Sequence, residues 1–95
     1  MIDLEDKYIK FIKNIISKYL DNFEVYLFGS RAKGTARKYS DVDIGVLSDE
    51  LTSNLIHKIE CEFENSSFPF KVDVINLKTV SNDFMKLIKD SLTKL

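Results

Sequence analysis

The 95-residue sequence has a single cysteine, Cys61, and no long apolar run. One cysteine cannot form an internal disulfide and sets no redox compartment; its segment has helical spacing, so we expect it to pack as a small apolar residue. A membrane span needs roughly 20 consecutive apolar residues. The first residues include acids, where a secretory signal peptide would carry basic ones. These absences argue against a membrane-bound or exported protein and favour a cytoplasmic location.

The sequence also lacks an excess of charge of either sign. Its 14 Lys and Arg and 15 Asp and Glu give a formal net charge of −1, which argues against a protein that binds nucleic acid directly. With 44% hydrophobic residues and no repeat or linker, one folded domain over residues 1–95 is expected. The local exception is residues 31–38, where Arg31, Lys33, Arg37 and Lys38 occur without an acid. Alone, such a segment indicates a solvated loop.

Apolar residues at helical spacing predict three helices. The first spans 4–20 and is expected to be capped by Asp3. The second spans 48–65 and begins with a Ser-Asp-Glu sequence that supplies a cap and first-turn acids. The third begins at Ser81, which caps it, and continues to Leu95.

Three β-rich segments, 23–28, 42–47 and 71–76, predict strands between these helices. The polar segment 30–40 is expected to be a loop with room for one helical turn. The predicted order is therefore α-β-β-α-β-α. The fold class is α/β (α+β), with helices flanking a small sheet.

Three aspartates lie in or next to the last two predicted strands. Asp41 and Asp43 share one face of their strand because side chains alternate, and Asp73 likewise faces away from its apolar neighbours. If these strands are adjacent, the three carboxylates converge. Clustered carboxylates repel one another and need a neutralising cation, and magnesium prefers oxygen ligands while leaving positions for triphosphate. Two such ions form the usual clamp for displacement at phosphorus.

The strand 23–28 stops abruptly at Gly29-Ser30. Glycine lets the backbone approach an anion closely, and the following amides and the Ser30 hydroxyl can donate hydrogen bonds to phosphate oxygens. The basic segment follows directly. Arg31 and Lys33 are the residues we expect to contact a triphosphate, whereas Arg37 and Lys38 are expected to be solvated or to face the acceptor.

Tyr39 and His57 are two further candidates for the site. Tyr39 flanks the basic segment and is equally compatible with nucleotide contact and with anchoring the loop. His57 is the one histidine of the chain. No cysteine or histidine partner at ligand spacing is expected for it, so a surface role is favoured over metal binding.

The combination of Gly29-Ser30, ten residues, Asp41-Val42-Asp43 and a later Val72-Asp73-Val74 resembles the nucleotidyltransferase superfamily that includes DNA polymerase beta. The run from Gly29 to Gly34 resembles most the minimal nucleotidyltransferase (MNT) family, with Lys33 where arginine is frequent. The resemblance covers essentially the whole chain. It implies the polymerase beta-like fold, with a small mixed sheet.

The resemblance also implies roles for the matched residues. Asp41 and Asp43 would bind two magnesium ions, and Asp73 would bind the catalytic ion near the acceptor. Gly29 and Ser30 would hold the β and γ phosphates of ATP. An acceptor hydroxyl would attack the α-phosphorus, releasing pyrophosphate.

The acceptor is implied by family and by size. Larger relatives carry an extra domain that grips the acceptor, and 95 residues leave no room for one. MNT proteins resemble antitoxins that are paired with helical HEPN toxins. This resemblance implies that the chain transfers AMP to a tyrosine of the toxin. It is also compatible with a homo-oligomer or with a hetero-oligomer that includes the toxin. Two alternatives remain open: neutralisation of the toxin by binding alone, and an aminoglycoside-type enzyme whose acceptor pocket is built by oligomerisation.

Overall fold

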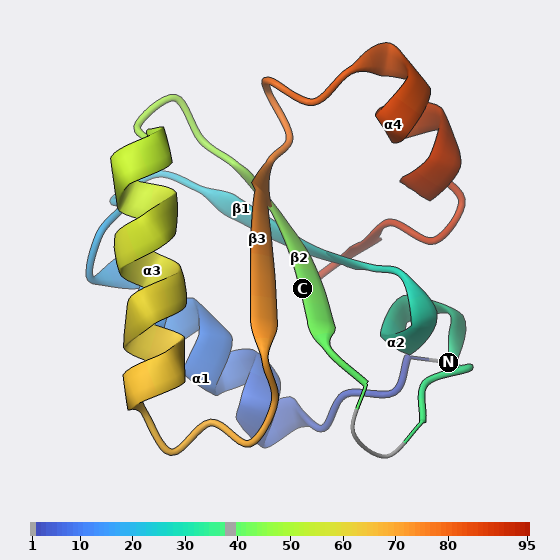
Figure 1. Ribbon diagram of the computed structural model, residues 1–95, viewed down its shortest axis with the longest axis horizontal. Coiled ribbons are helices and arrows are strands. Elements are labelled where there is room, and N and C mark those ends of the chain that lie inside the picture. Colours follow the sequence, from blue (N-terminus) through green and yellow to red (C-terminus); the bar gives the residue numbers. More distant parts are fainter. Residues whose placement is uncertain (1, 38–39) are drawn as a thin grey trace.

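The computed structural model describes residues 2–37 and 40–95 (Figure 1). Lys38 and Tyr39, both considered above, therefore lie outside the described residues. No helix in the described part of the chain is long and apolar enough to cross a bilayer. In chain order the elements are α1 Asp6–Ser17, β1 Glu24–Phe28, α2 Ser30–Lys33, β2 Val42–Leu47, α3 Ser53–Asn65, β3 Val72–Asn76, α4 Asn82–Ile88 and β4 Thr93–Lys94.

The strands form one mixed sheet in the order β3-β2-β1-β4. β1 pairs antiparallel with β2 on one side and with β4 on the other, whereas β2 and β3 run parallel. The parallel pair is joined through α3, which packs against β3, as a parallel connection requires a crossover. The predicted mixed sheet flanked by helices is confirmed, and the last two predicted strands are indeed neighbours.

One face of the sheet is fully covered by α1 and α3, and we call it the closed face. The alternate β2 residues Val42, Ile44 and Val46 have no exposed surface on this side. They pack in one cluster with Ile12 and Ile16 of α1 and with side chains of α3. α1 and α3 lie together against the sheet, well apart from α4 (Figure 1). The apolar residues at helical spacing in the sequence are thus the ones that α1 and α3 bury against the sheet.

The other face, which we call the open face, carries a smaller apolar cluster under α4. Its buried members are Phe28, Leu77 and Ile88. Leu77 lies over Gly45, where a Cβ atom would come within 2.7 Å of the Leu77 side chain. The remainder of this face is left to polar residues, and the site described below lies there.

The predicted first helix was too long, and its cap was wrong. α1 begins after Glu5, which makes no side-chain capping bond. The Asp3 carboxylate instead accepts a hydrogen bond from the Ala36 amide at 3.2 Å. Asp3 is therefore used to hold a distant loop, which local sequence signals do not report.

The start of the second helix was also predicted too early. α3 begins after Thr52, whose hydroxyl accepts from the Leu55 amide at 3.2 Å. The Ser48 hydroxyl donates to the Asn22 carbonyl at 2.6 Å, and the Glu50 carboxylate accepts from the Asn22 amide at 3.0 Å. These hydrogen bonds connect the β2–α3 loop to the segment before β1. The same residue types also favour a helix start, which is why the sequence predicted the helix too early.

The last predicted helix is confirmed at its start and wrong at its end. The Ser81 hydroxyl accepts from the Phe84 amide at 3.1 Å and caps α4, as expected. The helix stops at Ile88, and the chain then turns back to form β4 against β1. The Leu95 amide donates to the Val25 carbonyl at 2.8 Å. β4 covers an edge of β1 that would otherwise expose unpaired backbone groups.

Candidate active site

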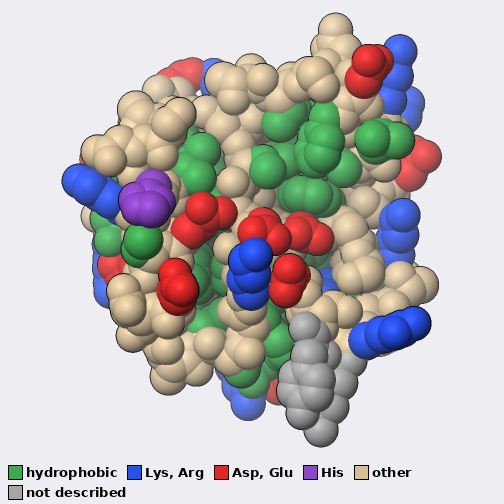
Figure 2. All heavy atoms as spheres, in the orientation of Figure 1, with side chains coloured by type: hydrophobic (Ala, Val, Ile, Leu, Met, Phe, Trp, Pro, Cys, Tyr) green, Lys and Arg blue, Asp and Glu red, His purple; other side chains and the backbone are tan. Residues whose placement is uncertain are grey.

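Two of the three predicted carboxylates are brought together by strand register. Asp43 of β2 and Asp73 of β3 are direct partners in the parallel pair, and both side chains belong to the open face. Asp41 lies just before β2 and is exposed. Acidic side chains gather at the centre of this face, next to a group of hydrophobic ones (Figure 2). The convergence expected from adjacent strands is therefore present for Asp43 and Asp73, whereas Asp41 is not drawn into a three-carboxylate cluster among the described residues.

Gly29 closes this site from the β1 side. Its backbone has φ +77°, a conformation that residues with a side chain rarely adopt. A Cβ atom here would lie 2.7 Å from the Asp43 Oδ2 atom. The dihedral angle therefore favours glycine, and a side chain here would displace the Asp43 carboxylate oxygen from its present position.

Ser30 and Lys33 follow Gly29 on the short helix α2. Ser30 begins the helix and is half-buried, and Lys33 at its end is exposed. The first amides of any helix lack acceptors inside that helix. In α2 these amides directly follow Gly29, beside the carboxylates, so their unused donors and the exposed ammonium are available to an anion at this end of the sheet.

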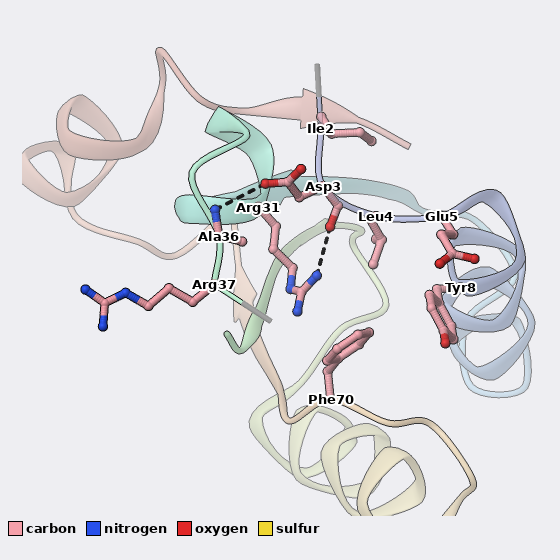
Figure 3. A pocket seen from close by; sticks show the side chains of 9 residues that line it. All are labelled: Ile2, Asp3, Leu4, Glu5, Tyr8, Arg31, Ala36, Arg37 and Phe70. Atoms are coloured by element: carbon pink, nitrogen blue, oxygen red, sulfur yellow. Dashed lines mark hydrogen bonds between the residues drawn. The ribbon is translucent and has the colours of Figure 1, made fainter. Parts of the chain in front are cut away.

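Arg31 is placed differently from the sequence expectation. It is only 6% exposed, and its guanidinium is committed to backbone carbonyls (Figure 3). Nε and Nη2 donate to the Ser40 carbonyl at 3.1 and 2.9 Å, and Nη1 donates to the Asp3 carbonyl at 2.9 Å. The Phe70 ring lies 4.0 Å from the guanidinium carbon. A direct contact between this side chain and a triphosphate would require these bonds to break.

The Arg31 contacts join three segments at one point. Ser40 immediately precedes Asp41, so the paired hydrogen bonds fix the peptide that leads into the carboxylates. The Asp3 amide also donates to the Arg31 carbonyl at 2.7 Å. Sequence reasoning missed this arrangement because a buried arginine has no local signature. Arg37, by contrast, is exposed and extends away from this cluster (Figure 3).

The carboxylates make the site electrostatically unfavourable on its own. Partial burial raises the pKa of the Asp43 carboxyl, and the charges of Asp73 and Asp41 raise it further. Among the described residues, the ion pair of these carboxylates is with the Lys71 ammonium, 3.9 Å from Asp73 Oδ1. Because this ammonium is mostly exposed, it neutralises little of the negative charge. A cation bound between the carboxylates would relieve this repulsion.

The carboxylates of this site fit a magnesium ion that is shared with a bound phosphate better than a metal ion whose ligands all come from the protein. Among the described residues, no three His, Cys, Asp or Glu side chains are gathered tightly enough to hold an ion by themselves. Magnesium in phosphate-transfer sites takes one or two carboxylates and completes its shell with water and phosphate oxygens. Oxygen donors from Asp41, Asp43 and Asp73 beside an anion-binding turn suit an ion that arrives with a triphosphate.

The expectation for His57 needs one correction. His57 Nε2 lies 3.6 Å from Cys61 Sγ, one turn further along α3, so a cysteine does stand close to it. His57 is exposed, as expected. The pair forms no metal cluster with a third ligand among the described residues.

Comparison with known proteins identifies the family. The Nucleotidyltransferase domain family matches residues 8–94. The chain belongs to this family. The identification confirms what the Gly29-Ser30 and Asp41-Val42-Asp43 spacing predicted.

Two relatives are about one-third identical to the chain over the aligned residues. The probable protein adenylyltransferase MntA of Haemophilus influenzae is 33% identical over 89 residues, which cover 93% of this chain and 78% of that protein. The protein adenylyltransferase MntA of Shewanella oneidensis is 32% identical over 77 residues, or 81% of this chain. The chain spans about half, 53%, of the Shewanella protein.

Two solved structures share the fold. A toxin-antitoxin crystal structure with AMP-PNP has a TM-score of 0.75 at 22% identity, covering 87% of this chain and 68% of that one. A complex of a tri-AMPylated Shewanella oneidensis HEPN toxin with its MNT antitoxin has a TM-score of 0.62 at 21% identity, covering 90% and 69%. At these identities the likeness confirms the architecture alone.

Proposed function

We propose that this nucleotidyltransferase domain transfers AMP from ATP, with magnesium, to a hydroxyl of a HEPN-type partner protein and so acts as an antitoxin. One observation carries the proposal: Asp43 and Asp73 are register partners, and Gly29 lies against Asp43. Carboxylates on one side and an anion-binding turn on the other are what a metal-bound triphosphate needs.

The relatives support both the reaction and the partner. The two similar curated proteins are named as protein adenylyltransferases. One structural neighbour is a toxin-antitoxin structure solved with AMP-PNP. The other is an MNT antitoxin in complex with a HEPN toxin that carries AMP groups. A HEPN partner and ATP within the cell would place the proposed activity in the cytoplasm.

Residue roles follow from position. Asp41, Asp43 and Asp73 would hold two magnesium ions, which neutralise triphosphate charge and activate the acceptor hydroxyl. Gly29, Ser30 and Lys33 would bind the β and γ phosphates. Arg31 would act through the Ser40 peptide, because its guanidinium is already hydrogen-bonded there.

The bonds exchanged in the reaction balance without a further reactant. The acceptor oxygen forms a bond to the α-phosphorus, and the bond from that phosphorus to the bridging oxygen breaks. Pyrophosphate leaves toward Gly29 and Ser30. The acceptor proton passes to Asp73 or to water, and Asp73 is the carboxylate farthest along the sheet from the phosphate side.

The test uses a purified HEPN-type protein as the acceptor. Incubation with magnesium and ATP should add one or more AMP masses to the HEPN protein, and EDTA should prevent the addition. Asp41→Asn should abolish transfer, whereas Asp21→Asn, in the segment before β1 and away from Gly29, should leave it unchanged. An unmodified HEPN protein in the wild-type reaction would refute the proposal. Neutralisation that survives Asp41→Asn would instead favour antitoxin action by binding alone.

A further inference from the structure

The direction from which an acceptor must arrive follows from the sheet order, given the proposed function. Displacement at phosphorus is in line, so the leaving pyrophosphate and the attacking hydroxyl lie on opposite sides of the reacting phosphorus. The proposed phosphate side is Gly29-Ser30, at the end of β1. In the order β3-β2-β1, Asp73 lies across Asp43 from that turn. The hydroxyl therefore approaches from the β3 side.

A cavity opens on that side of the molecule. It has a volume of about 660 Å³ and lies between α3 and the segment that leads into β3. Asp73 is the one of the three site carboxylates that lines it. We call it the acceptor groove. Asp73 therefore belongs both to this groove and to the candidate active site, on the side from which the hydroxyl approaches.

The walls of the acceptor groove combine a rigid apolar floor with an acidic rim. Phe63 and Phe68 form the floor; both are buried, and their ring centroids are 5.3 Å apart. Glu60, Glu64 and Asp73 supply carboxylates to the walls. The lysine of the groove, Lys71, is already 3.9 Å from Asp73. Acids thus outnumber the cation, and such a surface attracts a cationic segment and repels an acidic one.

The edge of β3 restricts how a segment can bind. The Val74 amide at this edge donates to Glu60 Oε2 at 2.9 Å, so this donor is taken by the protein itself. A bound chain that extended the sheet would have to displace the Glu60 carboxylate. Recognition through side chains, presented by a helix or loop, needs no such displacement.

From these features we infer that the acceptor groove binds the hydroxyl-bearing segment of the partner protein, and that this segment carries lysine or arginine next to the acceptor residue. The apolar part of the acceptor side chain would rest on the phenylalanine floor, and its hydroxyl would reach Asp73. The carboxylate of Glu64 is exposed and belongs to none of the ion pairs found among the described residues. It is therefore free to pair with a cation of the partner.

The test reverses the charge of Glu64. The variant Glu64→Arg should fold, because a cation is favourable in the last turn of α3. We expect the dissociation constant and the KM for the HEPN protein to rise at least about tenfold, with Glu64→Gln intermediate. Affinity for magnesium-ATP should not change. Asp21→Arg, the same charge reversal in the segment before β1, should change neither quantity.

The possible outcomes separate this inference from the proposed function. Unchanged binding and KM for the HEPN protein in Glu64→Arg would overturn the inference, as would an equal loss of ATP affinity. If the wild type binds the HEPN protein without modifying it, the proposed reaction is refuted. The effect of Glu64→Arg on the dissociation constant then still tests whether the acceptor groove binds the HEPN protein. A wild type that neither binds nor modifies the HEPN protein overturns both.

Discussion

The two faces of the sheet use the same strand for opposite purposes. On the closed face, Val42, Ile44 and Val46 of β2 are fully buried under α1 and α3. On the open face the intervening positions include Asp43 and the small residue Gly45. Alternation along one six-residue strand therefore separates the core from the chemistry. The closed face stabilises the domain, and the open face keeps polar groups available.

The carboxylates of the open face lower the stability of the folded domain, and the proposed function needs them. Burial and two neighbouring carboxylates raise the pKa of Asp43, which means that its ionised form is disfavoured in the folded protein. Active sites commonly retain such unfavourable groups because catalysis needs them. The comparison predicts that substitutions on the two faces change stability by different amounts, and in one case with opposite sign.

The largest effect is expected on the closed face. Ile44→Ala should lower the free energy of unfolding by about 2–5 kcal/mol, because it removes a fully buried side chain and leaves a cavity. Ile75, on the neighbouring strand but in the open-face cluster, is only partly buried, so Ile75→Ala should cost roughly half as much or less. Urea unfolding measures both. Equal losses would contradict the division into two faces.

A substitution at the site turn should come next. Gly29→Ala forces a side chain into φ +77° and against Asp43, which should cost about 1–3 kcal/mol and reduce AMP transfer about 100-fold or more. Gly34, with φ 75°, provides the matched control. Gly34→Ala has the same backbone penalty but lies at the opposite end of α2 from Gly29, so it should lose stability while retaining most activity.

Arg31→Lys should have a smaller effect on stability and a clear one on the site. Lysine keeps the charge but cannot donate the paired hydrogen bonds to Ser40, so we expect a loss of about 1 kcal/mol. Affinity for magnesium-ATP should fall several-fold, because the peptide before Asp41 is less fixed. Calorimetric titration with magnesium-ATP measures this. Arg37→Lys, at an exposed position, should match the wild type.

The smallest effect should have the opposite sign. Without magnesium, Asp43→Asn should raise the melting temperature slightly at neutral pH, because it removes a disfavoured carboxylate from the open face. The folded-state pKa is raised, so the penalty is present when Asp43 is ionised and disappears as pH falls through that pKa. The two proteins should therefore converge in acid. A variant less stable than the wild type at neutral pH would refute this reading of the open face.

Much of the architecture could be predicted because it depends on local pattern. β2 spans Val42–Leu47 as expected, and Ser81 caps α4. The errors came where residues serve distant partners. Asp3 and Ser48 suit helix starts but bind Ala36 and Asn22 instead, and the apolar spacing after Ile88 fits a helix but forms β4 on the free edge of β1. Edge pairing depends on the whole sheet, which no local window contains.

The sequence by itself predicted the nucleotidyltransferase family from the spacing of Gly29-Ser30 and the aspartates, and it determined that Asp43 faces away from Val42 and Ile44. These properties depend on residue type and on the two-residue period of a strand. Only the tertiary structure decided that Asp43 meets Asp73 and that Arg31 is buried against the peptide before Asp41. It also decided that a groove opens beside Asp73. The physical reason is that strand register, burial and cavities arise from packing between segments far apart in the chain.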